Sequence, residues 1–96
     1  MISFPFSVHI LSGHSMQPAI NDGDRVIVSN WAYLFLQPKV GDVVVFSSSD
    51  GKRYAKRITA VANKNELIVE GDNKSDSRKL PPILKKAIIG KVIAMY

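Results

Sequence analysis

Cysteine is absent from the 96 residues of this chain. Its absence excludes disulfide frameworks, thiolate zinc sites, iron–sulfur clusters and a thiol nucleophile. Glycine-rich phosphate loops are missing too, and the two histidines, His9 and His14, have neither the spacing nor the neighbouring carboxylates of a metal site. We therefore expect a protein that uses neither a metal nor another cofactor.

Long stretches of basic residues and long stretches of apolar residues are also lacking. Thirteen Lys and Arg against eight Asp and Glu give a formal charge of +5, but the basic residues are scattered singly and in pairs. Without a polybasic tract or an RNA-binding strand motif, we expect no nucleic-acid partner. The uncharged stretch before Asp22 lacks a basic start and is interrupted by Ser, Pro, His and Gly, so it predicts neither a signal peptide nor a membrane span.

The residues that are present suit one small core. Hydrophobic residues make up 46% of the sequence and no repeat or linker divides it, so residues 1–96 are expected to form a single domain. Short β-branched runs bounded by turn residues predict strands at 25–28, 42–46, 54–61, 66–70 and 88–96. Strands at this spacing predict a mainly β fold, either a small antiparallel β-barrel or a coiled sheet. The only helix-like segment, 81–86, predicts one short turn.

The segment from Trp31 to Leu36 concentrates three aromatic residues and two leucines between two predicted strands. Such a run is either part of the core or a hydrophobic rim that contacts a membrane surface or an apolar peptide, since Trp and Tyr suit an interface with one wet side. Both interpretations are open at this point. The second adds peripheral membrane contact through Trp31 to Leu36 to the candidate interactions.

Ser15 is the strongest candidate for a catalytic group. It lies in the segment Ser-Gly-His-Ser-Met-Gln-Pro, where Gly13 and Pro18 constrain the backbone as a nucleophile on an exposed turn requires. His14 is a poor base for it, because neighbouring side chains of an extended chain point to opposite faces. His9 could reach Ser15 only if the chain folds back.

A lysine is the other choice of base. With an ordinary pKa of ~10.4 a lysine is protonated at neutral pH, but burial can lower that pKa by ~3–5 units. Lys56 fits this requirement, because strand alternation places it on one face with Tyr54, Ile58 and Ala60. The alternative is a lysine that extends to solvent, which is common in strands of small domains.

Several short motifs, in one order along the chain, resemble those of the signal peptidase I family. They are Ser12 to Pro18, Asp22 to Val26, Gly41 to Phe46, Lys56 to Ile58, Gly71 to Asn73 and Asp76 to Arg78. The resemblance covers most of residues 12–93 and implies a signal peptidase-like catalytic core, a β-fold serine endopeptidase in which Ser15 is the nucleophile and Lys56 the general base. It also implies cleavage after small residues at the end of an N-terminal leader of a precursor protein.

The resemblance implies roles for further residues. The backbone N–H of Ser15 would stabilise the oxyanion, Gly13 occupies the position at which some members carry a second, hydroxyl donor, and Met16 would shape the substrate groove or pack in the core. A loop near Ser15 and Lys56, the predicted catalytic dyad, would brace the strand that carries Lys56. The residues of this loop are Asp72, Asn73, Ser75, Asp76, Ser77 and Arg78. Ser75 is the candidate to orient Lys56, within an insert that is shorter than in many members.

Three functions fit these observations. The first is removal of an N-terminal leader or signal peptide, either by a membrane-bound signal peptidase or by a short, anchorless relative similar to the nickel superoxide dismutase maturation proteases, which the length favours. The second is a self-cleaving repressor-type Ser/Lys protease domain, and the third is a non-catalytic peptide-binding β-barrel. The anchorless version implies a cytoplasmic protein if Met1 is the native start, whereas a signal peptidase would be membrane-associated.

Overall fold

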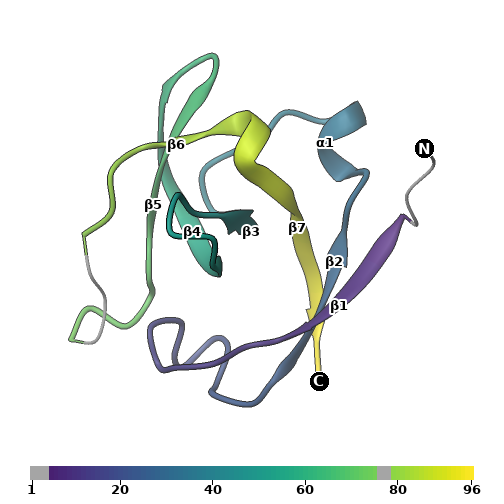
Figure 1. The fold of residues 1–96 in the computed structure, drawn as a ribbon, viewed down its shortest axis with the longest axis vertical. Coiled ribbons are helices and arrows are strands. Elements are labelled where there is room, and N and C mark those ends of the chain that lie inside the picture. Colours follow the sequence, from purple (N-terminus) through teal and green to yellow (C-terminus); the bar gives the residue numbers. More distant parts are fainter. Residues whose placement is uncertain (1–4, 76–78) are drawn as a thin grey trace.

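One antiparallel sheet of seven strands dominates the part of the chain that the computed structural model describes, residues 5–75 and 79–96 (Figure 1). The strands lie in the order β1-β2-β7-β3-β4-β5-β6. The elements in chain order are β1 (Phe6–Ile10), β2 (Arg25–Ser29), α1 (Ala32–Phe35), β3 (Val43–Ser47), β4 (Arg53–Asn63), β5 (Glu66–Glu70), β6 (Ile83–Leu84), the 3-10 helix η1 (Lys85–Ala87) and β7 (Ile88–Met95). The prediction of a mainly β fold is confirmed, and of its two forms the coiled, open sheet is the one observed, with β1 and β6 at its edges.

The five strands expected from β-branched runs are all present with nearly the same bounds. The prediction of a helical turn at 81–86 is wrong in its first half, because Ile83 and Leu84 form β6 against β5 and the 3-10 turn begins only at Lys85. Two consecutive prolines precede β6, and proline restricts the residue before it to extended backbone. β1 has no β-branched run, because its apolar residues alternate with Ser7 and His9.

Two groups of buried side chains hold the coiled sheet together. The first group contains Met16, Ile20, Val26, Val28, Val45 and Ala55. The second contains Val44, Phe46, Ile58, Leu67 and Val69. Because successive side chains of a strand point to opposite faces, β3 contributes Val45 to the first group and its neighbours Val44 and Phe46 to the second. Register shifts in β2, β3 and β4 mark bulges, which bend a sheet so that both groups can be covered.

β7 joins the two halves of the sheet. It pairs with β2 on one side, at Val28↔Val92, and with β3 on the other, at Val45↔Gly90. Gly90 is buried, and a side chain at this position would meet the backbone of Ser29. β7 and β2 therefore approach each other more closely than a residue with a Cβ would permit.

The aromatic segment forms α1 and its flanks, and most of it faces solvent. Leu34, Phe35 and Leu36 are 72%, 80% and 60% exposed, and α1 contains no buried residue. Only Tyr33 packs against the second core group. Of the two interpretations of this segment, the structure supports a hydrophobic rim. In residues 5–75 and 79–96, no helix has the length and apolar character needed to cross a membrane.

Candidate active site

The segment between β1 and β2 holds Ser15 in a closed loop. Its two ends are joined by hydrogen bonds from the Leu11 N–H to the Asp24 carbonyl and from the Gly23 N–H to the Leu11 carbonyl, both 2.8 Å long. Within the loop, the Gly13 N–H donates to the Asp22 carboxylate at 2.8 Å. Gly13 has a φ of 99°, a left-handed conformation that glycine adopts without steric cost. The sequence expectation that Gly13 constrains the turn before Ser15 agrees with this geometry.

Met16 anchors the same loop from below. Its side chain is fully buried in the first core group, and its carbonyl accepts a 2.9 Å hydrogen bond from the Ile20 N–H. Because Met16 points into the core, the side chain before it is free to take the opposite, outward direction. Of the two roles expected for Met16, the structure therefore supports the core, and its effect on a substrate is indirect.

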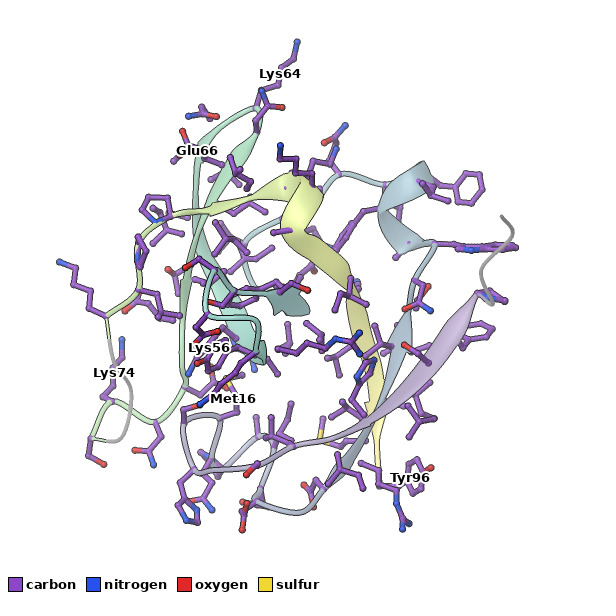
Figure 2. The ribbon with its side chains drawn as sticks, in the orientation of Figure 1. Met16, Lys56, Lys64, Glu66, Lys74 and Tyr96 are labelled. Atoms are coloured by element: carbon purple, nitrogen blue, oxygen red, sulfur yellow. The ribbon has the colours of Figure 1, made fainter. Side chains whose placement is uncertain are left out.

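Lys56 lies on β4, opposite Val44 of β3, and is only 7% exposed. Its Nζ lies 2.8 Å from Ser15 Oγ, a hydrogen bond between residues 41 positions apart in the sequence. Figure 2 shows Lys56 reaching from the sheet toward the loop that carries Met16. The alternation expected along this strand is observed for Ile58, which is buried, but a bulge after Ile58 leaves Ala60 exposed.

The two histidines contact residues other than Ser15, the residue that a base would have to reach. His9 Nε2 lies 2.9 Å from the Ser7 hydroxyl, and His14 Nδ1 lies 3.0 Å from Gln17 Nε2. Burial, and to a smaller extent the charge of Arg53, lower the pKa of His9. Of the candidate bases considered in the sequence, Lys56 is the one that the fold brings to Ser15.

Asn73 fixes the peptide group that precedes Ser15. Its side-chain amide donates to the His14 carbonyl at 3.0 Å, and its backbone N–H donates to the Ser15 carbonyl at 2.8 Å. The His14 carbonyl and the Ser15 N–H belong to one planar peptide group, in which they point in opposite directions. By holding the carbonyl, Asn73 sets the direction of the Ser15 N–H. The sequence expectation placed Asn73 beside the lysine strand, and the structure brings it to the nucleophile loop.

Ser75 supports Asn73 in turn. The Ser75 hydroxyl donates to Asn73 Oδ1 at 2.8 Å, and the Ser75 N–H donates to the same oxygen at 3.2 Å. An amide whose oxygen accepts these bonds must present its NH₂ group to the other side, toward the His14 carbonyl. Three residues of the expected loop, Asp76, Ser77 and Arg78, lie outside the described residues.

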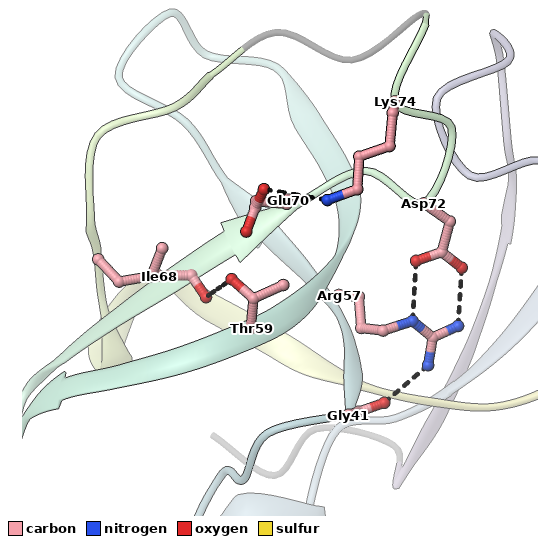
Figure 3. Close-up of polar contacts among 7 residues, drawn as sticks. All are labelled: Gly41, Arg57, Thr59, Ile68, Glu70, Asp72 and Lys74. Atoms are coloured by element: carbon pink, nitrogen blue, oxygen red, sulfur yellow. Dashed lines mark hydrogen bonds and ion pairs between the residues drawn. The ribbon is translucent and has the colours of Figure 1, made fainter.

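Asp72, one of the loop residues expected to brace the lysine strand, pairs with Arg57 of that strand. Two guanidinium nitrogens of Arg57 donate to the two carboxylate oxygens of Asp72 at 2.8 Å, and the third donates to the Gly41 carbonyl at 2.8 Å (Figure 3). The hydrogen bonds that Arg57 donates to Asp72 outweigh partial burial and raise the pKa of Arg57. This pair joins the residue after Lys56 to the loop that carries Asn73, so the supports of Lys56 and of Ser15 are connected.

A buried carboxylate near the dyad strand is a feature that the sequence did not reveal. Asp42 is 6% exposed and accepts a 2.8 Å hydrogen bond from the Tyr33 hydroxyl, with Lys39 and Lys91 at 3.2 Å and 3.5 Å. Burial disfavours the charged carboxylate, but the bonds from Tyr33 and Lys39 outweigh it and lower the pKa of Asp42. The Asp42 carbonyl also accepts the Ile58 N–H at 2.8 Å, at the point where β4 leaves the dyad.

A cleft of about 510 Å³ opens beside the dyad and is lined by both Ser15 and Lys56. The chain from His9 to Ser12 lines one side, and the first residues of β4 line the other. Val26, Val45 and Ala55 add apolar side chains. Within the described residues no group of three His, Asp or Glu side chains is placed to hold a metal ion. The arrangement offers a hydroxyl, an amine and an apolar groove, which together suit acyl transfer from a peptide.

Comparison with known proteins finds a matching family and several similar curated proteins. The family model described as signal peptidase, peptidase S26, matches residues 1–65. Signal peptidase I of Bacillus caldolyticus is 28% identical over 94 residues, which are 93% of this chain and 52% of that protein. Signal peptidase IB of Staphylococcus aureus (strain Mu50) is 31% identical over 87 residues, which are 85% of this chain and 46% of that protein. The chain thus spans about half the length of the curated relatives it matches.

Proposed function

The chain belongs to the signal peptidase, peptidase S26 family, and from this premise we propose that it is a serine endopeptidase that removes an N-terminal leader or signal peptide from a precursor protein. The observation that carries the proposal is the 2.8 Å hydrogen bond between Lys56 Nζ and Ser15 Oγ. A nucleophile within hydrogen-bond reach of a base is the arrangement that covalent catalysis requires.

In the proposed reaction, neutral Lys56 accepts the proton of the Ser15 hydroxyl as the oxygen attacks the scissile carbonyl carbon. The tetrahedral intermediate collapses when the Lys56 ammonium donates that proton to the leaving amine and the C–N bond breaks. The acyl group is then an ester on Ser15. Water, deprotonated by Lys56, attacks this ester, which releases the new carboxyl terminus and restores the Ser15 hydroxyl.

The surroundings of Lys56 favour the neutral amine that this reaction needs. Val44 and Ile58, its neighbours across and along the sheet, are fully buried, and removal from water disfavours an ammonium ion. The carboxylate of Asp72 is engaged by both arms of the Arg57 guanidinium. The charge of Asp72 is therefore compensated by Arg57.

The oxyanion donor in this proposal is the backbone N–H of Ser15, whose direction Asn73 sets through the His14 carbonyl. Loss of a single such donor typically lowers turnover by about 10²–10³-fold in other enzymes. Gly13 supplies no hydroxyl at the position of a second donor. The cleft is lined by small and branched apolar side chains near the dyad, which agrees with a substrate that has small residues before the scissile bond.

The test is cleavage of candidate precursors that carry small residues before the scissile bond, with the products mapped by mass spectrometry. The native chain should cleave, whereas Ser15→Ala, Lys56→Ala and Lys56→Arg should not, since a guanidinium stays protonated. The native rate should rise with pH, because Lys56 must lose its own proton before it accepts that of Ser15.

Each alternative gives a different outcome in this assay. Cleavage that survives in both alanine variants would remove the dyad from the mechanism. A self-cleaving repressor-type domain would cut its own chain and leave added precursors intact. A non-catalytic peptide-binding domain would bind the precursors equally well with and without Ser15 and Lys56.

A further inference from the structure

The cleft beside the dyad has two chemically different ends. Ser15 and Lys56 lie at one end, whereas Lys52 and Arg53 at the start of β4 line the other, together with His9 of β1. Three steps of extended strand separate Arg53 from Lys56, and at about 3.3 Å per residue their backbone positions lie about 10 Å apart. A peptide extended along the cleft would therefore meet the basic end about three residues away from the bond at Ser15.

Arg53 carries an uncompensated charge at this end. In the described part of the chain, no carboxylate lies within ion-pair distance of Arg53. Arg57 lies four residues further along the same strand. It donates two hydrogen bonds of 2.8 Å to the Asp72 carboxylate. The protein thus supplies a carboxylate for Arg57 but leaves Arg53 exposed.

The groups near Arg53 do not neutralise its positive charge. Asp50, the closest acidic residue along the chain, accepts the Lys52 N–H at 2.8 Å and the Tyr54 hydroxyl at 2.7 Å, which tie its two oxygens to the turn before β4. His9 is held by Ser7 at 2.9 Å, and burial followed by the charge of Arg53 lowers the pKa of His9. His9 therefore offers a hydrogen bond at neutral pH, and Arg53 supplies the positive charge.

We propose that the cleft recognises an acidic side chain of the substrate, Asp or Glu, two to four residues from the scissile bond, and that Arg53 is the residue that selects it. A guanidinium binds a carboxylate through two parallel hydrogen bonds, so it distinguishes Asp from Asn by charge and by geometry. The apolar stretch formed by Val26, Val45 and Ala55 between the two ends accepts the small residues next to the bond. This specificity rests on the proposed endopeptidase function of the same site.

The experiment compares peptides with alanine before the scissile bond that differ only in one residue, Asp, Asn or Lys, placed in turn at four positions on each side. We expect the native protein to cleave one Asp peptide about 10-fold faster in kcat/KM than its Asn counterpart, the effect of one charged hydrogen-bonded pair. Arg53→Ala should lose this preference, and Arg53→Glu should favour Lys at the same position.

Lys64→Glu is the matched control, because it changes the charge equally in the exposed turn after β4, and Figure 2 shows Lys64 far from Lys56. This variant should keep the preference for Asp. Equal cleavage of the Asp and Asn peptides by the native protein, or an Asp preference that persists in Arg53→Glu, would overturn the proposal.

A binding assay separates this proposal from the proposed function. With Ser15→Ala, which cannot cleave, fluorescence anisotropy should still show about 10-fold tighter binding of the Asp peptide, and the added Arg53→Ala change should abolish the difference. A preference seen in binding while the native protein cleaves nothing would refute the endopeptidase and keep the acidic specificity. Peptides that bind without regard to the acidic residue would refute the specificity alone.

Discussion

The hydroxyl and the backbone N–H of Ser15 are held by different residues. Lys56 contacts the hydroxyl, and Asn73 contacts the carbonyls on either side of that N–H. Changes at the two supports should therefore affect different parts of the reaction. In the proposed mechanism, loss of Lys56 would remove the proton acceptor, whereas loss of Asn73 would leave the acceptor in place and loosen the oxyanion donor.

Asn73→Ala is expected to lower kcat by about 10-fold to 100-fold, less than complete loss of an oxyanion donor, because the Ser15 N–H remains but is no longer held. KM and the shape of the pH–rate profile should change little, since Lys56 is untouched. Ser75→Ala, which removes only the hydroxyl that supports Asn73, should give a smaller decrease. A shifted pH profile in Asn73→Ala would instead assign Asn73 to the lysine.

α1 is anchored by a hydrogen bond to a buried carboxylate. Its four residues are too few to form a stable helix alone, and Tyr33 ties it to β3 by donating to Asp42 at 2.8 Å. Because burial and the bond to Asp42 raise the pKa of Tyr33, the phenol keeps its proton and remains the donor. The bond thus joins the exposed rim to the strand beside the dyad.

Tyr33→Phe tests this contact through its pH dependence. The folded pKa of Asp42 is lowered from 3.8, so its stabilising effect is present above that value and is lost as the pH falls through the folded pKa. At pH 7 the variant should lose about 1–2 kcal/mol of unfolding free energy, and the difference from the native protein should shrink in acid. Urea unfolding at several pH values measures both effects.

Tyr54→Phe is the control for this experiment, because Tyr54 donates to Asp50 at an exposed turn. It should change the unfolding free energy much less. A difference between Tyr33→Phe and the native protein that stays constant down to pH 2 would show that Asp42 does not act through its charge.

At the scale of the whole molecule, the exposed rim and the net charge of +5 both suit an anionic membrane surface. We propose peripheral membrane contact through Trp31 to Leu36.

The double substitution Leu34→Ser and Phe35→Ser should weaken co-sedimentation with vesicles containing phosphatidylserine, without loss of stability, because both side chains are exposed. Val61→Ser, which removes an apolar side chain that is 50% exposed on β4, should bind as the native protein does. Equal binding by the rim variant would exclude this surface.

The sequence predicts those parts of the fold that depend on local patterns. β-branched runs identify β2, β3, β4, β5 and β7, because strands of this kind bury one face and are bounded by turn residues. α1 and β6 escape prediction because each is too short for its period to show. β1 escapes because its apolar residues, Phe6, Val8 and Ile10, alternate with polar ones and are more than half exposed.

In the site, too, sequence patterns predict the local features and miss the contacts between residues that are distant in the sequence. Alternation along β4 suggests an apolar setting for Lys56, and the family resemblance connects it to Ser15. The bond from Asn73 to the His14 carbonyl joins residues 59 positions apart and uses a backbone acceptor, for which no sequence pattern exists. The Tyr33 and Asp42 pair is hidden for a related reason, because its two halves belong to a short helix and a turn that look unrelated.

The place of β7 in the sheet has a consequence for the order in which a ribosome makes this protein. β1 and β2 flank the loop of Ser15, β4 carries Lys56, and β7 is the strand that pairs with both halves. β7 is also translated after the other six strands. The nascent chain therefore lacks the strand that links the two halves of the sheet until residue 95 has emerged, so Ser15 and Lys56 are expected to come together in the complete sheet only after all seven strands have been made.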